Sequence, residues 1–302
     1  MLFASAAVKH PEVFLKAGLG ARWVAIISIG VFFIPFISYL FPGVFWYGTA
    51  SAINYISMCI FSLALFYHGG KDKRDLVLTI MFMIPCIVWI FRTSIMGTAL
   101  ALMMFFFFKY KAKSLPIIFG VLILFIASIF FIPSVKEKMF KDKENANTEQ
   151  LRSGKISMDD INSNGRFAMW EALMKIFYIN KEVTGSGTGS VQNYMYNHYV
   201  FGGLKVTHSD YVQMLCDNGL LAIFLYAIST LSMIFHSFIE YNKRKNSIPI
   251  KICAITAGSA MTGLLLTMYS DNVVNYSMAT LSYPFGFYGM MLGLIANNKN
   301  KK

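Results

Sequence analysis

The residue types best suited to chemistry are two arginines and a histidine, Arg92, Arg166 and His208. Arg92 interrupts a long apolar run, where an ionisable residue is a functional candidate by default. The alternative is an arginine that extends to the lipid headgroups and marks a turn. Arg166 begins a predicted helix, and the positive end of a helix dipole disfavours a cation there, so a bound anion would explain it. A solvated surface arginine is the alternative.

His208 stands just before a short predicted helix that starts at Ser209 or Asp210. Imidazole can accept a proton near neutral pH, so His208 is a candidate general base. A loop histidine without a role is the alternative, and His198 is a competing base in the same stretch. Three adjacent residues, His208, Ser209 and Asp210, cannot form a hydrolase triad, because such a triad is assembled from separated segments.

Three glycines, Gly185, Gly187 and Gly189, alternate along residues 184–189, which we call the glycine turn. Their spacing matches neither the dinucleotide-binding nor the P-loop motif. A tight backbone turn is expected, and a nest of amides that binds an anion is the alternative. Asp210 is a possible supporting residue of the same site. The four cysteines show no metal-binding or redox spacing, and neither a metal nor a cofactor is expected.

The composition predicts that these residues are held by membrane helices. The chain has 302 residues, of which 56% are hydrophobic and 14% charged, and its mean hydropathy is +0.53. Its apolar runs have the lengths that cross a hydrocarbon core of about 30 Å. We therefore expect an all-α polytopic membrane protein with about eight transmembrane helices, at residues 22–41, 44–68, 75–91, 93–108, 115–133, 219–239, 249–270 and 277–296.

Charge predicts the orientation of these helices. Residues 134–217 contain ten basic and ten acidic side chains, whereas the rest of the chain contains 17 basic and five acidic ones. This is the positive-inside pattern, and the scattered basic residues argue against a nucleic-acid partner. We expect a cytoplasmic lead or interfacial helix at 1–21, five spans within 22–133, a long outer loop at 134–218 that carries the site, and three spans with a basic cytoplasmic tail at 219–302.

Local patterns refine the expected position of the site. One helix over 75–108 would be about 50 Å long, too long for one crossing, so two helices should meet near Arg92 at the outer end of a hairpin. Apolar residues at helical spacing predict an amphipathic helix over 166–178, in which Trp170 suits a membrane interface. A second short helix should end at Asn218-Gly219, before the sixth span.

Taken together, these motifs resemble the O-antigen ligase and O-antigen polymerase family of bacterial inner-membrane glycosyltransferases. The resemblance covers residues 75–240, and its motifs are Arg92, Gly165-Arg166-x-x-x-Trp170, the glycine turn, His208 and Asn218-Gly219, in this order. It implies a GT-C-type helical fold and a metal-independent reaction on a glycan carried by undecaprenyl diphosphate. It also implies that Arg92 and Arg166 hold the diphosphate and that His208 activates the acceptor hydroxyl.

The favoured function is polymerisation of O-antigen or capsule-type glycan units, because residues 271–276 resemble the polymerase branch more closely. The alternative within the family is a ligase that transfers glycan to lipid A-core. A lipid-glycan flippase or transporter is the alternative from another class. The expected partners are the undecaprenyl-diphosphate-linked oligosaccharide, the glycan or lipid A-core acceptor, and membrane lipids. The expected location is the bacterial inner membrane, with the long loop on the periplasmic face.

Overall fold

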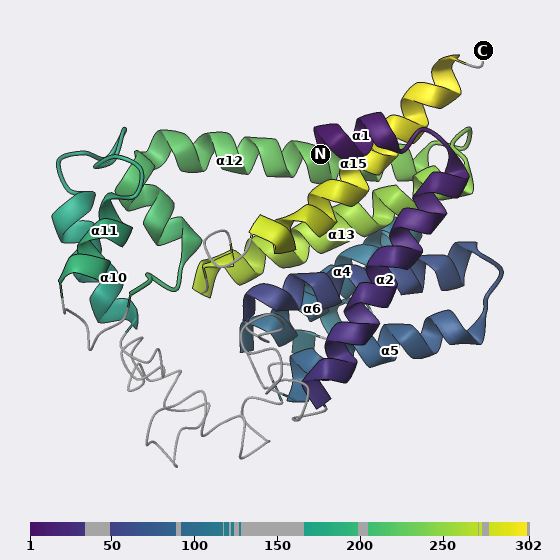
Figure 1. Ribbon diagram of the computed structural model, residues 1–302, viewed down its shortest axis with the longest axis horizontal. Helices are drawn as coiled ribbons and strands as arrows, with labels where there is room; N and C mark the ends of the chain where they lie inside the picture. The colour runs from purple at the N-terminus through teal and green to yellow at the C-terminus, as the bar shows by residue number, and fades with distance from the viewer. Residues whose placement is uncertain are drawn as a thin grey trace. The chain divides into compact units, whose positions relative to one another are not determined.

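The computed structural model describes residues 1–33, 49–88, 92–116, 118–120, 122–123, 127, 166–198, 205–270, 272–273 and 278–300. Every regular element in these residues is a helix (Figure 1), which confirms the all-α prediction. The chain divides into two units. The first contains Met1–Lys109, His208–Tyr211 and Ile223–Lys302, and the second contains Tyr110–Thr207 and Val212–Ala222.

The helices of the first unit are mostly long and apolar. They are α1 (Leu2–Ala7), α2 (Pro11–Phe33), α4 (Thr49–His68), α5 (Lys73–Val88), α6 (Arg92–Tyr110), most of α12 (Asp210–Asn242), α13 (Ile248–Ser270) and α15 (Met278–Asn300). Within the described residues, four segments are long and apolar enough to cross a membrane: Pro11–Gly30, Thr93–Ser114, Asp210–Asn242 and Ile248–Tyr269. These four segments agree with the prediction of a polytopic membrane protein. The count of eight spans remains a prediction.

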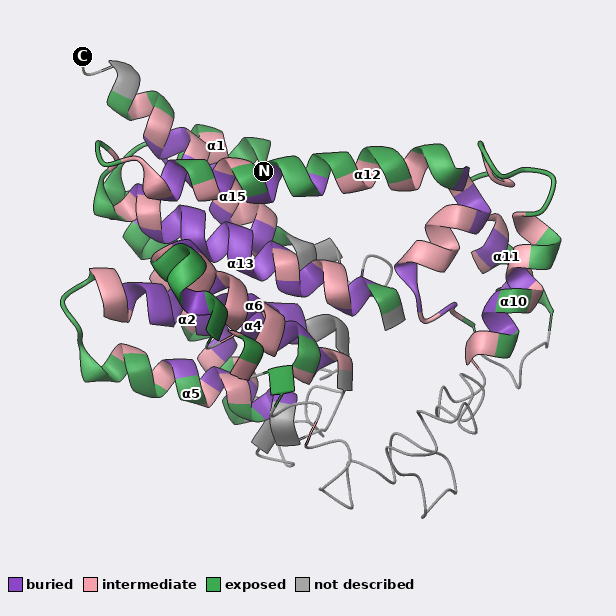
Figure 2. Cartoon of the chain, turned by 180° about the vertical axis from the view of Figure 1, so that it is seen from behind, coloured by how far each residue is buried: buried purple, intermediate pink, exposed green. Residues whose placement is uncertain are grey.

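Helices α4 and α13 form the centre of the first unit. Figure 2 shows both largely buried, whereas α2, α5 and α12 expose much of their length. In the most apolar stretch of α13, 78% of the residues are buried in the protein, whereas in that of α2, within Pro11–Gly30, only 22% are buried. Helix α4 packs against α2, α5, α13 and α15. The outer helices therefore direct their remaining apolar surface away from the protein.

Helix α6 lies very close to α13, and two glycines permit this approach. A Cβ atom on Gly97 of α6 would lie 2.9 Å from Cγ2 of Thr267, and one on Gly263 of α13 would lie 2.8 Å from the Gly97 carbonyl oxygen. Small residues commonly let transmembrane helices approach at backbone distance. Because Arg92 begins α6, this contact fixes the helix that carries it.

The first apolar helix starts earlier than expected. Helix α2 begins at Pro11, eleven residues before the predicted start at residue 22. Proline suits the first turn of a helix, where its missing amide hydrogen costs nothing. Arg22 of this helix forms a largely buried ion pair with Asp75 of α5.

The structure describes α5 up to Val88 and α6 from Arg92, in agreement with two helices within residues 75–108, and residues 89–91 between them lie outside the described residues. The predicted fifth span, residues 115–133, and the outer residues 134–165 lie mainly or wholly outside the described residues. So do Asp271 and residues 274–277 of the stretch that suggested the polymerase branch.

In the described residues, the second unit contains the 3-10 helix η1 (Lys111–Ser114), residues Val212–Ala222 of α12, and two further short helices around a small core. They are α10 (Arg166–Phe177), as predicted to within one residue, and α11 (Ser190–Asn197), which was not predicted. Their core consists of Met169, Trp170, Leu173, Val191, Met195 and Cys216. Trp170 is only 8% exposed, so its assignment to a membrane interface was wrong. The indole is instead packed between elements of this unit.

Candidate functional site

Helix α10 begins at Arg166. Trp170, one turn later, holds the helix against the rest of the second unit. The Trp170 indole donates a buried hydrogen bond from Nε1 to the Thr207 carbonyl oxygen at 2.6 Å. Arg166 is half-buried and engaged in an interaction within the protein. Because Thr207 immediately precedes His208, the hydrogen bond from the Trp170 indole anchors the backbone next to His208.

His208 adopts an unusual backbone conformation just before α12. Its φ is +51°, in the left-handed region, where few non-glycine residues are found. Such residues persist where their surroundings hold them, and they concentrate at functional sites. Ser209 and Asp210, which follow, are buried, whereas the His208 side chain is half-exposed.

The segment after His208 is held on the first unit by Tyr211. The Tyr211 hydroxyl donates to the Leu265 carbonyl oxygen of α13 at 2.7 Å. The predicted helix from Asp210 ends where expected, because Gly219 has non-helical angles of φ 71° and ψ −174° that divide α12. The first part of α12 is therefore a short helix, and the second part is the long apolar span.

The glycine turn packs against this division of α12 through backbone hydrogen bonds. The amide of Ser186 donates to the Cys216 carbonyl at 2.9 Å, and that of Gly187 to the Asp217 carbonyl at 2.8 Å. From the other side, the Leu220 amide donates to the Glu182 carbonyl at 2.8 Å. Carbonyls that a helix end leaves without internal partners are thereby satisfied.

Two glycines make this close packing possible. Gly185 and Gly219 both have positive φ, of 69° and 71°. A Cβ atom on Gly185 would lie 2.5 Å from the Asn218 amide nitrogen, and one on Gly219 would lie 2.3 Å from the Val183 carbonyl oxygen. The two backbones touch directly, so neither position has room for a side chain.

Asp217 supplies the anion that the glycine turn was suspected of binding. Its carboxylate accepts hydrogen bonds from the Gly189 and Val191 amides, each at 3.0 Å, at the N-terminus of α11. Gly189 is the N-cap of that helix and has no side chain to cap it, so the buried carboxylate takes that part. The tight-turn interpretation is confirmed, and at these amides the nest alternative is wrong for an external ligand.

An exposed carboxyl stabilises the start of the same turn. Glu182 accepts a hydrogen bond at 2.9 Å from the amide of Asn180, whose φ is +67°. Bonds from the backbone amides of Glu182 and Asn180 hold the pKa of this carboxyl below its ordinary value. The turn is thus tied at both ends, by Glu182 at its start and by Asp217 at its close.

The competing histidine, His198, is occupied by its own helix. At the C-terminal end of α11, its ring stacks on Tyr194 with centroids 4.5 Å apart. Its Nδ1 lies 3.0 Å from the Tyr194 carbonyl oxygen. This contact makes His198 a cap of α11.

The candidate residues fall in both units. Arg166 and the glycine turn belong to the second unit, while Arg92, His208 and Asp210 belong to the first. Arg92 begins α6, and its side chain lies outside the described residues. No group of three or more His, Cys, Asp or Glu side chains within the described part of the chain could hold a metal ion.

Two contributors were missed in the sequence, Asp217 and the Trp170–Thr207 bond. Asp217 was interpreted only as the end of a short helix, yet it caps a helix that begins 27 residues earlier in the chain. A signal was present, because the helix after Gly189 lacks a capping side chain of its own. The partner of a buried indole, in contrast, has no sequence signature.

These elements define the class of a helical membrane protein whose sequence carries a small packed unit between apolar helices. Residues 91–227 match the family model described as O-antigen ligase (Wzy_C). The match confirms the predicted resemblance to the O-antigen ligase family over these residues. It includes Arg92, Arg166, the glycine turn and His208, and it supports a function in glycan transfer at a membrane. None of the curated proteins compared with the chain matches it.

Proposed function

We propose that this protein is a metal-independent membrane glycosyltransferase that takes glycan units from undecaprenyl diphosphate on the periplasmic face of the inner membrane. The observation that carries the proposal is the family match over 91–227, which contains both candidate arginines and His208. The held, left-handed backbone at His208 supports it, because such conformations concentrate at functional sites.

In the proposed reaction, the acceptor hydroxyl oxygen attacks the anomeric carbon of the donor sugar. The bond from this carbon to the diphosphate oxygen breaks, and its electron pair leaves with the lipid diphosphate. His208 takes the hydroxyl proton as general base. The guanidinium groups of Arg92 and Arg166 bind the diphosphate, whose negative charge rises as it leaves. Planar guanidinium groups suit this task, because each can bind two phosphate oxygens at once.

The nature of the acceptor separates two forms of this function. In a polymerase the acceptor is the end of another lipid-linked glycan, and this is the form we favour. In a ligase it is lipid A-core, and the description of the matching family favours that form. A lipid-glycan flippase is the competing class, in which neither His208 nor the arginines would meet a reacting bond.

The test is His208→Ala in a host that lacks its own copy, read as the lipopolysaccharide ladder on a gel. Loss of a general base should lower transfer by about 10²-fold or more. A defective polymerase leaves core with a single repeat unit, whereas a defective ligase leaves bare core and polymer on the lipid carrier. His198→Ala is the matched control, and it should leave the ladder unchanged.

Two results would contradict the proposal. A normal ladder from well-inserted His208→Ala protein would remove His208 as the base. Bare core without any polymer on the carrier would indicate that repeat units never reach the outer face, as expected of a defective flippase.

A further inference from the structure

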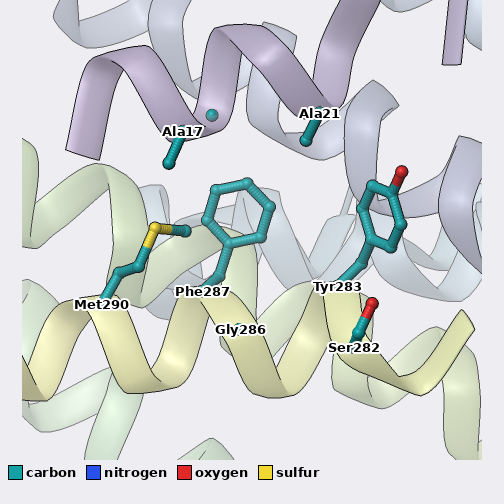
Figure 3. Close-up of a pocket in the computed structure, with 8 residues that line it drawn as sticks. Ala17, Ala21, Ser282, Tyr283, Gly286, Phe287 and Met290 are labelled. Carbon is teal, nitrogen blue, oxygen red and sulfur yellow. The ribbon is translucent and has the colours of Figure 1, made fainter. Parts of the chain in front are cut away.

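Two features of the first unit involve none of the residues assigned to the reaction. One is a groove between α2 and α15, where Ala17 and Ala21 lie opposite the rings of Tyr283 and Phe287 (Figure 3). None of the residues that line this groove is charged, so the groove has no means of selecting an ionic ligand. The other feature is a group of lysines at the ends of α4, α6 and α13, and its charge points to a definite class of ligand.

The lysine cluster consists of Lys71, Lys109 and Lys251, which come from three separate elements. Lys71 lies in the turn between α4 and α5, Lys109 in the last turn of α6, and Lys251 in the first turn of α13. The charge of Lys71 acts on Lys109, and the charges of Lys109 and Lys251 both act on the His68 ring at the end of α4. Because like charges repel, an anion placed among them would gain attraction from several elements at once.

Two aromatic contacts form the base of the lysine cluster. Nζ of Lys109 lies 3.5 Å from the centre of the Tyr67 ring, in a cation–π contact. Nε2 of His68 lies 3.2 Å from the hydroxyl oxygen of Tyr241, and the two rings meet edge to face with centroids 5.7 Å apart. Tyr241 is buried, whereas His68 and the three lysines remain accessible. The cluster thus has a packed base and an open side.

Acidic residues at the same helix ends are engaged with other groups. The Asp75 carboxylate pairs with Arg22, and the Glu240 carboxylate pairs with Lys243. The carboxylate of Asp72 accepts an amide hydrogen bond within its own turn. The lysine cluster therefore keeps an excess of positive charge, which is complementary to an anion from outside the protein.

The position of the cluster favours a lipid over a soluble anion. Lys109 and Lys251 lie near one end of the apolar segments Thr93–Ser114 and Ile248–Tyr269. At such ends a lysine lays its apolar stem along the helix and places its ammonium group among the headgroups, and tyrosines gather at the same depth. Basic pockets between membrane helices on the cytoplasmic side are suited to anionic headgroups.

We propose that Lys71, Lys109 and Lys251 bind the phosphate-containing headgroup of an anionic phospholipid, in the leaflet that the charge pattern assigns to the cytoplasm. Lys109 and Arg92 lie at opposite ends of α6, about 25 Å apart along the helix axis. The lipid site is therefore separate from the diphosphate site of the proposed reaction. A lipid bound here joins the turn after α4 to the ends of α6 and α13.

The test compares two variants that lose the same charge. The cluster variant carries Lys71→Gln, Lys109→Gln and Lys251→Gln. The control variant carries Lys73→Gln, Arg244→Gln and Lys245→Gln, which change three exposed basic residues that the charge pattern assigns to the same face. General attraction of lipid to a positive face affects both variants equally, whereas a built site affects only the first.

The probe is phosphatidylglycerol, titrated into the full-length protein in a neutral detergent, with bound lipid counted by native mass spectrometry. The wild-type protein and the control variant should retain phosphatidylglycerol in preference to phosphatidylcholine with the same acyl chains. The cluster variant should bind it about 10- to 100-fold more weakly, because each lysine near a headgroup contributes several-fold. Should the cluster variant fail to fold, Lys71→Gln alone, in an exposed turn, should weaken binding about fivefold.

Three outcomes would overturn the inference. Equal weakening in the cluster and control variants would reduce the effect to general attraction. Equal retention of phosphatidylcholine would show that the acyl chains, and not the charge, are bound. Competition by inorganic phosphate at the concentrations at which the lipid binds would make the cluster a site for a soluble anion. None of these measurements depends on glycan transfer, so they test the lipid site whatever the outcome for the proposed reaction.

Discussion

Trp170 controls the residue that precedes the proposed base. Its buried indole holds the Thr207 carbonyl, and His208 follows in a left-handed conformation that this anchoring helps to maintain. A backbone held in this way presents the imidazole in one orientation, which proton transfer requires. The hydrogen bond therefore belongs both to the stability of the second unit and to the orientation of His208.

We expect Trp170→Phe to keep most of the aromatic packing and remove only the indole donor. A buried carbonyl left without a partner costs about 1–3 kcal/mol, so the free energy of unfolding should fall by that amount. Glycan transfer should fall with it, because Thr207 is released. Thermal denaturation of the purified protein and the lipopolysaccharide ladder measure the two effects.

Trp23→Phe is the control for this change. Trp23 lies on α2 and is 63% exposed, so its replacement should change neither stability nor transfer measurably. Equal behaviour of the two variants would show that the Trp170–Thr207 bond does not contribute to the site.

Among the secondary-structure elements, the close contact of the glycine turn with α12 depends on Gly219. A side chain at Gly219 would clash with the backbone of Val183, and the positive φ of Gly219 would strain any other residue. Gly219→Ala should therefore destabilise the protein by about 2 kcal/mol or more.

The outcome for Gly219→Ala is best judged against Gly20→Ala. Gly20 lies in a regular part of α2 with open space around it, and alanine there should be neutral or stabilising by up to about 1 kcal/mol. Thermal denaturation of both variants measures this difference, and a Gly219→Ala protein as stable as Gly20→Ala would contradict the packing described.

The elements that the sequence predicts well are those with strong local signals. The presence of two helices, α5 and α6, follows from the limit on helix length. Helix α10 follows from its apolar spacing, and the end of the short helix follows from Asn218-Gly219. Signals that depend on distant partners fail. The start of α2 was misplaced because residues 1–21, with Lys9, Lys16 and Pro11, looked too mixed for an apolar helix, whereas α2 begins at Pro11. Trp170 was misplaced because interface and core tryptophans look alike in sequence.

Candidate residues could be chosen by residue type, but their arrangement could not be predicted. Arg92, Arg166 and His208 were singled out because a charge or a histidine stands where a helix begins or an apolar run is broken. The internal contacts that hold the glycine turn could not be inferred, because each bond to Cys216 or Asp217 joins segments about 30 residues apart. Only the fold brings these segments together.

At the scale of the whole molecule, the basic clusters predict which ends of the helices face the cytoplasm. A cysteine placed at Lys181, which is exposed beside the glycine turn, should react with an impermeant maleimide added from the periplasmic side. Cysteines at Arg74 and Arg244, also exposed, should react only after the membrane is opened.

The natural cysteines favour this experiment, because all four are buried and should give little background. Labelling of Arg74→Cys or Arg244→Cys from outside, with Lys181→Cys protected, would invert the topology. The proposed reaction would then face the wrong side of the membrane for the periplasmic donor.

The capping of α11 by Asp217 also bears on the order in which the chain is made. A ribosome delivers Gly189 and Val191 before it delivers Asp217, so the amides at the start of α11 have no carboxylate until the first part of α12 has been synthesised. The second unit is therefore incomplete until the segment leading into the next apolar helix has been made. A protein truncated after residue 205 should be open to added protease between α10 and α11, whereas one that continues through residue 225 should resist it.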